Sequence, residues 1–249
     1  MKSTTSLLVF ENPALIAYYA AQKLATLSTK FTPVKPANIA LSGGSTPKAL
    51  FKLLSEAPFA DVVQWKNLRF FWGDERIVPP DDPESNFGAA NALLFTKLDE
   101  PPAYYRVAGL LEPEEANLQY RNVIAQMVPI NASGLPVFDW IMLGMGSDGH
   151  TASIFPGRSL KSVQDDICGL AEHPETGQKR VSFTMKVINA ARDISFLAAG
   201  SGKAEMLKHV LEDENVIYPA AQVAPESGSL EWCIDQAASA GLTSKNTWE

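Results

Sequence analysis

The segment 144–150, Gly-Met-Gly-Ser-Asp-Gly-His, joins a glycine-rich turn to two side chains that can handle a proton. It follows an apolar run, and Asp148 precedes His150 by two positions. An imidazole accepts protons near neutral pH, and a neighbouring carboxylate can fix its tautomer and raise its basicity. A lone histidine is more often structural than catalytic, but the glycine-lined setting favours catalysis. We therefore expect His150 to be a general base assisted by Asp148.

The same glycines also spell G-x-G-x-x-G, the pattern of dinucleotide-binding turns. Such a turn requires a helix that starts among the glycines. Here Asp148 stands where a pyrophosphate would approach, and Pro156 and Gly157 would end any helix after about two turns. Both observations disfavour a dinucleotide site.

A second glycine turn lies at 41–50, in "LSGGSTPKAL". The chain leaves a predicted strand through Gly43 and Gly44 and enters a predicted helix, with Ser45 or Thr46 as its N-cap and Pro47 as its first residue. The free N–H groups and the positive end of such a helix can hold a phosphate. A well-capped strand-to-helix turn without a ligand would explain this motif equally well. The pattern of nucleoside triphosphatases is absent, so a nucleoside triphosphate is not indicated.

Four charged residues stand next to predicted strands or helices. Asp74 and Arg76 directly follow an aromatic strand, Arg180 precedes another strand, and Lys203 starts a helix. Charged side chains are solvated surface groups by default. In a chain of net charge −7, however, Arg76, Arg180 and Lys203 could supply the local positive charge that an anionic ligand needs. Asp74 could bind a substrate hydroxyl or orient a catalytic base.

Short apolar runs alternate with helical patterns along most of the chain, which predicts β-α units and a mostly parallel sheet in one large α/β domain. In such a sheet, the loops that follow the strands near 38–44, 68–74, 138–144 and 193–200 should share one rim. The segment 229–242 has apolar residues at helical spacing, and we expect a helix there that covers a face of the sheet; these residues are Leu230, Cys233, Ile234 and Ala237.

The composition excludes several classes of protein. The 249 residues are 46% hydrophobic and 20% charged, as in ordinary globular proteins, and the negative net charge disfavours nucleic-acid binding. The N-terminal segment has no apolar run long enough for a signal peptide or a membrane span, so we expect a cytoplasmic protein. Cys168 and Cys233 form no C-x-x-C pattern and are expected to be buried thiols. Three histidines and two cysteines without ligand spacing make a metal site improbable.

Taken together, the motifs resemble the 6-phosphogluconolactonase family and, more distantly, the glucosamine-6-phosphate deaminases. The matching segments occur in the order of the family and cover nearly the whole chain: "LSGGSTPKALF", "WGDERIVPPDDPESNF", "GMGSDGHTASIFPG", "GSGKAEML" and "LEWCIDQAA". The form "GHTASIFPG" is similar to the lactonases, where the deaminases resemble "GHIAFNEP".

This resemblance implies a single α/β domain over 1–249, an open Rossmann-like sheet with helices on both faces and an active site at the carboxyl ends of its strands. It implies hydrolysis of 6-phospho-D-glucono-1,5-lactone to 6-phospho-D-gluconate in the oxidative pentose phosphate pathway, without cofactor or metal. It also suggests a monomer with a functional link to glucose-6-phosphate dehydrogenase. The implied phosphate-binding residues are Gly43, Gly44, Ser45, Thr46, Arg180 and Lys203, and the implied catalytic residues are His150, Asp148, Asp74 and Arg76.

Two alternative functions stay open, and one alternative catalytic residue is disfavoured. A sugar-phosphate isomerase or deaminase could use the same phosphate loop, and a sensor could bind the sugar phosphate without catalysis. Ser153 as a nucleophile is disfavoured, because "TASIF" is not the G-x-S-x-G turn of serine hydrolases.

Overall fold

A seven-stranded sheet forms the centre of the protein in a computed structural model that describes residues 4–213 and 217–243. Every strand pair in it is parallel, which confirms the predicted open α/β sheet. The spatial order is β1 (Thr4–Phe10), β11 (Ser229–Asp235), β10 (Asp193–Ala198), β6 (Trp140–Leu143), β2 (Ala37–Leu41), β3 (Leu68–Trp72) and β5 (Ala103–Tyr104).

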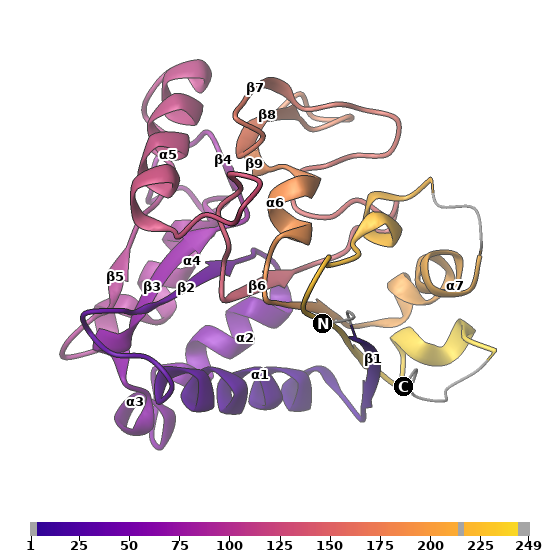
Figure 1. Cartoon of the computed structure of the whole chain (residues 1–249). Helices are drawn as coiled ribbons and strands as arrows, with labels where there is room; N and C mark the ends of the chain where they lie inside the picture. The colour runs from indigo at the N-terminus through magenta and orange to yellow at the C-terminus, as the bar shows by residue number, and fades with distance from the viewer. Residues whose placement is uncertain (1–3, 214–216, 244–249) are drawn as a thin grey trace.

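Helices cover both faces of this sheet, as expected for a parallel sheet whose central strands β2 and β6 are buried along their whole length (Figure 1). One face packs against α1 (Pro13–Ser28), α2 (Ser45–Leu54), α3 (Phe59–Val62) and α4 (Asn86–Leu93). The other packs against α5 (Pro113–Met127), α6 (Met185–Asn189) and α7 (Ala204–Glu212). Short 3-10 helices follow at η1 (Trp65–Asn67), η2 (Phe95–Lys97), η3 (Ser201–Lys203), η4 (Pro219–Gln222) and η5 (Ala238–Gly241).

A smaller antiparallel sheet lies beside the carboxyl end of β3, on the opposite side of the molecule from α1 (Figure 1). Its order is β4 (Asp74–Arg76), β9 (Lys179–Phe183), β8 (Cys168–Glu172) and β7 (Lys161–Gln164). The chain crosses from the large sheet into this one at Gly73, whose carbonyl accepts a hydrogen bond from the amide of Phe183 at 2.8 Å. The small sheet therefore brings Arg180 of β9 next to β4.

The predicted helix at 229–242 is wrong. This segment contains β11, a strand between β1 and β10, and only the short helix η5 follows it. Trp232 and Cys233 are buried, and the ring of Trp232 stacks on Phe196 with centroids 3.8 Å apart. A strand buried on both faces has an apolar run rather than an alternating pattern, so a short run of this kind can match helical spacing by chance.

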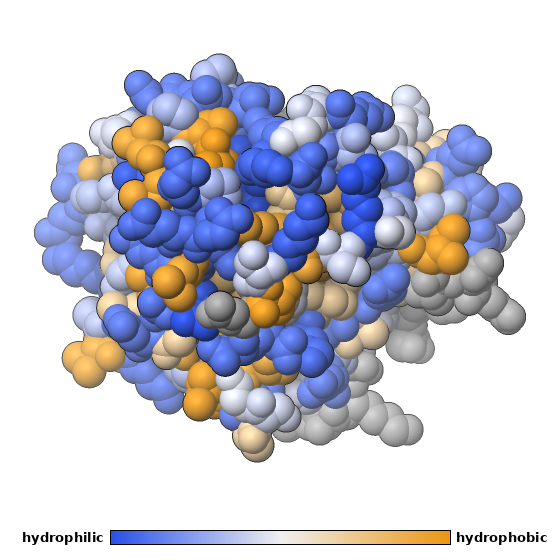
Figure 2. Space-filling model, turned by 90° about the horizontal axis from the view of Figure 1, so that it is seen from above, coloured by the Kyte–Doolittle hydropathy of each residue, from blue (hydrophilic) through white to orange (hydrophobic). Residues whose placement is uncertain are grey.

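The surface seen in Figure 2 carries mostly hydrophilic side chains, and the two cysteines are buried. Figure 2 shows a face on which hydrophilic side chains predominate and hydrophobic ones form small, scattered groups. In the two ranges that the structure describes, no helix has the length and hydrophobicity to cross a bilayer. Cys168 and Cys233 are buried free thiols, and burial raises the pKa of Cys168 to about 12.

Candidate active site

A cavity of about 220 Å³ lies at the carboxyl ends of the central strands. The loops after β2, β3, β6 and β10 all contribute to it, which confirms that these loops share one rim. Its lining contains three cationic side chains and one carboxylate, a balance that favours an anionic ligand. The lining residues are Ser42, Gly43, Gly44, Asp74, Arg76, Asn86, Gly144, Met145, Gly146, His150, Ala152, Arg180 and Lys203.

His150 and Asp148 form a hydrogen-bonded pair at this rim. The Nδ1 atom of His150 lies 2.6 Å from Oδ1 of Asp148, and the His150 amide donates to the same oxygen at 3.2 Å. Burial acts to raise the pKa of Asp148, but the charge of His150 and these hydrogen bonds outweigh it, so the pKa is lowered. Because Asp148 engages Nδ1, the nitrogen left for a ligand is Nε2. Asp148 itself does not line the cavity and contacts it through His150.

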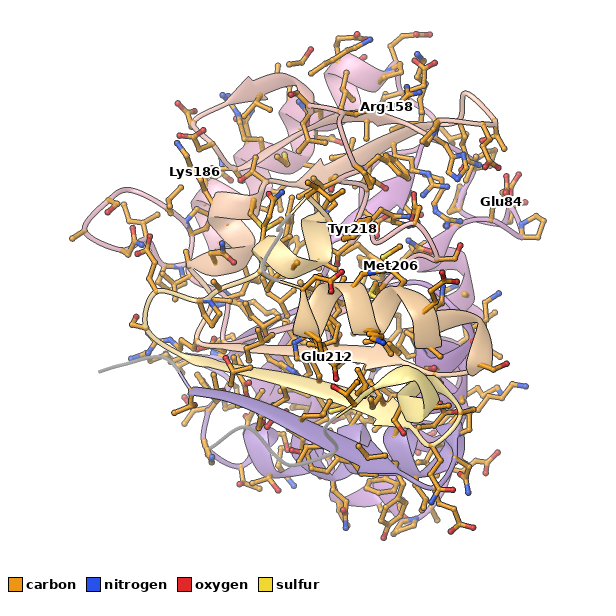
Figure 3. The ribbon with its side chains drawn as sticks, turned by 90° about the vertical axis from the view of Figure 1, so that its right-hand side faces the viewer. Glu84, Arg158, Lys186, Met206, Glu212 and Tyr218 are labelled. Atoms are coloured by element: carbon orange, nitrogen blue, oxygen red, sulfur yellow. The ribbon has the colours of Figure 1, made fainter. Side chains whose placement is uncertain are left out.

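The glycines of this loop make room for that pair and for a neighbouring aromatic ring. A Cβ atom on Gly146 would lie 2.2 Å from Nδ1 of His150 and 2.3 Å from Oδ1 of Asp148. Gly149 has φ +79°, and a Cβ there would lie 2.7 Å from Tyr218, which is labelled in Figure 3 and whose ring centroid lies 6.1 Å from that of His209 in α7. No helix begins among these glycines, in agreement with the argument against a dinucleotide site.

Beneath the cavity, Ser153 connects Asp74 to Arg180. Its hydroxyl donates to Oδ2 of Asp74 at 2.6 Å and accepts from Nη1 of Arg180 at 3.4 Å. Ser153 is only 1% exposed, so its hydroxyl is a structural link and is not placed to attack a substrate. Burial lowers the pKa of Arg180, and the positive charge of Arg76 adds to that effect.

Two residues next to Asp74 escaped the sequence analysis. The buried carboxylate of Glu75 accepts hydrogen bonds from the amides of Asn86 and Phe87 and from the hydroxyl of Ser85, and so anchors the start of α4. Burial raises the pKa of Glu75. Asn86 lines the cavity, and its Nδ2 donates to the carbonyl of Asp74 at 3.0 Å. The signal that could have indicated Asn86 was Ser85, a strong N-cap residue, directly before it.

The glycine turn at 41–50 contributes backbone rather than side chains. Gly43 and Gly44 line the cavity, and Gly44 has φ +114° at the N-cap of α2. Ser45 and Thr46 are the first residues of that helix and do not line the cavity. The predicted cap is wrong, since no side chain caps α2 and Pro47 is its third residue.

The other two cationic side chains of the cavity are Lys203, from η3, and Arg76, from β4. Burial lowers the pKa of Lys203, while the negative charge of Asp148 acts to raise it. Arg76 donates from Nη1 to the carbonyl of Glu84 at 2.7 Å, and its buried Nε has no hydrogen-bond partner among the described residues. Within 4–213 and 217–243, no three His, Cys, Asp or Glu side chains are grouped so as to hold a metal ion.

The amino-acid sequence is similar to a family of known enzymes and to a bacterial lactonase. The family of glucosamine-6-phosphate isomerases and 6-phosphogluconolactonases matches residues 11–232. A 6-phosphogluconolactonase from Haemophilus influenzae is 42% identical over 226 residues, which cover 89% of this chain and 95% of that protein.

Two solved structures superpose on nearly the whole chain. The crystal structure of a protein named devB has a TM-score of 0.90 at 44% identity, with 96% of this chain and 100% of the other covered. A 6-phosphogluconolactonase from Trypanosoma cruzi has a TM-score of 0.85 at 29% identity, with 98% and 99% covered.

Proposed function

Because the chain belongs to the family of glucosamine-6-phosphate isomerases and 6-phosphogluconolactonases, we propose that it hydrolyses 6-phospho-D-glucono-1,5-lactone to 6-phospho-D-gluconate. The names of its relatives support a carboxylic ester hydrolase of the pentose phosphate pathway. The observation that carries the proposal is the His150–Asp148 pair beside a cavity with three cationic side chains.

His150 would act as the general base for the attacking water. Its Nδ1–H is held by Asp148, so Nε2 carries the lone pair that can take a proton from water. The water oxygen bonds to the lactone carbonyl carbon, and a tetrahedral oxyanion forms. The bond from this carbon to the ring oxygen then breaks, and the imidazolium of His150 returns its proton to that oxygen. The new acid group loses its proton to solvent.

The three cationic side chains would bind two different anionic groups, the oxyanion and the phosphate. Arg76, whose Nε has no hydrogen-bond partner in the described part of the chain, would stabilise the oxyanion, because a positioned donor binds this charge most strongly in a dry site. Lys203, Arg180 and the amides of Gly43 and Gly44 would hold the phosphate. Asp74 would orient a ring hydroxyl. Phosphate contacts far from the carbonyl place the reacting atoms, so a lactone without phosphate should react less efficiently.

The test generates the phosphorylated lactone in place from glucose 6-phosphate and follows its loss above the spontaneous rate. Replacement of His150 by Ala should lower kcat/KM by about 10²- to 10⁴-fold in a folded protein. The matched control is His209→Ala, since His209 pairs with Asp213 at the same 2.6 Å but lies outside the cavity. That control should keep wild-type activity. Normal turnover by a folded His150→Ala variant would refute the mechanism.

A wild-type protein without activity would refute the lactonase proposal itself. Binding of 6-phosphogluconate without turnover would then indicate a sensor, and release of ammonia from glucosamine 6-phosphate would indicate a deaminase.

We also propose that the chain acts as a cytoplasmic monomer on lactone delivered by glucose-6-phosphate dehydrogenase. The loops of one chain bring three cationic side chains, Asp74 and His150 together around the cavity. Light scattering of the purified protein, with and without the dehydrogenase, measures both associations, and a dimer that loses activity on dilution would contradict the monomer.

A further inference from the structure

Asn86 presents the oxygen of its side-chain amide to the cavity. The residue is 6% exposed and lines the cavity together with Asp74 and His150. Its Nδ2 donates to the carbonyl oxygen of Asp74, and because only the nitrogen of the amide can do so, the position of Oδ1 is determined. Oδ1 lies against Gly43, where a Cβ atom would come within 2.0 Å of it. Within the described residues, Oδ1 accepts no hydrogen bond.

The backbone that carries the Asn86 side chain is held in place by hydrogen bonds within the protein. The carboxylate of Glu75 accepts from the backbone N–H of Asn86 at 2.8 Å and from that of Phe87 at 2.7 Å. The Ser85 hydroxyl accepts from the backbone N–H of Gly88 at 2.9 Å. The first turn of α4 therefore cannot shift without breaking several buried hydrogen bonds. A group fixed in this way loses little conformational entropy when it binds a ligand.

The chemistry of Oδ1 limits what can pair with it. The oxygens of the dianionic phosphate, the lactone carbonyl and the ring oxygen are all acceptors, and Oδ1, itself an acceptor, cannot form a hydrogen bond with them. The ring hydroxyls of the substrate are donors. An acceptor that gives up water to a ligand and gains no donor in exchange loses a hydrogen bond, which makes Oδ1 selective for a ligand that supplies a donor.

We propose that Asn86 is a further substrate-binding residue whose Oδ1 accepts a hydrogen bond from a ring hydroxyl and so selects hydroxylated sugar phosphates. This inference rests on the proposed function, because it takes the phosphorylated lactone as the ligand of the cavity. The cations bind the anionic parts of that ligand, and Asn86 recognises one of its ring hydroxyl groups.

The experiment compares kcat/KM for the parent lactone and for its 2-deoxy, 3-deoxy and 4-deoxy analogues. For the wild type, one analogue should react about 2- to 12-fold less efficiently than the parent, the effect of one neutral hydrogen bond. Asn86→Ala should lose a similar factor with the parent lactone and lose nothing further with that analogue. Asn86→Ser, whose hydroxyl is too short to replace Oδ1, gives the same comparison if the Ala variant does not fold.

The analogue series separates binding from a structural effect. Loss of the bond from Nδ2 to Asp74 would slow the parent and all analogues by the same factor, and that uniform loss would overturn the inference. Asn91→Ala, on the same helix, is the matched control and should behave as wild type. An active wild type that does not discriminate among the four lactones would overturn the role of Asn86 alone, whereas an inactive wild type would refute the proposed function.

Discussion

Replacement of Gly146 by Ala should separate the His150–Asp148 pair while the protein stays folded. The added Cβ would lie 2.2 Å from Nδ1 and 2.4 Å from Cε1 of His150, and 2.3 Å from Oδ1 of Asp148. Ordinary van der Waals contact begins at 3.4 Å, so Nδ1 must move by 3.4 − 2.2 = 1.2 Å. Gly146 is not among the residues of positive φ, so Ala fits its backbone and the conflict is with two side chains that can turn toward solvent.

The cost should therefore appear in catalysis and hardly in stability. A misplacement of about 1 Å at a reacting group costs about 10²-fold in rate, or about 2.7 kcal/mol in the activation barrier. The assay measures kcat/KM for the phosphorylated lactone together with the melting temperature. Gly202→Ala is the matched control, because a Cβ at Gly202 meets nothing within 4 Å. A folded Gly146→Ala protein with wild-type kcat/KM would show that the close pairing is not needed for the reaction.

Three further predictions address the rest of the site. Lys203→Gln should raise KM for the phosphorylated lactone by about 10- to 100-fold, as expected for a hydrogen bond to a charged group, and leave turnover of glucono-δ-lactone unchanged; an equal loss with both substrates would contradict phosphate binding. Ser153→Ala should lower kcat/KM by about tenfold in a folded protein, because Asp74 and Arg180 lose their link, and unchanged kinetics would show that the link is dispensable. Asp148 has a pKa below its ordinary 3.8, so its ionised form stabilises the fold above that pH, and the stabilisation is lost as the pH falls through the lowered pKa. Urea titrations should thus find wild type more stable than Asp148→Asn at about pH 5, with a difference that shrinks as the pH falls below 3.8; a difference that grows with acid would have the wrong sign.

Local sequence patterns were sufficient for most of the large sheet and for the loops that carry the site. Glycine turns after apolar strands, and the order of those strands along the chain, indicated that 43–44, 74–76, 144–150 and the region near Lys203 meet at one rim. These signals are local, because they depend on backbone conformation and on the period of apolar residues. The same local logic failed at β11, where burial on both faces removed the alternation that distinguishes a strand from a helix.

By itself, the sequence determined the parallel α/β architecture, the absence of a helix among the glycines of 144–150, and the adjacency of Asp148 and His150, since each follows from neighbouring residues. Only the tertiary structure decided that Arg180 reaches the cavity, that Ser153 is buried under Asp74, and that Asn86 faces Gly43. These contacts join residues 27 to 79 positions apart through the small antiparallel sheet or the start of α4. Strand pairing and burial across such separations depend on the packing of the whole chain, and no local pattern of residue types encodes them.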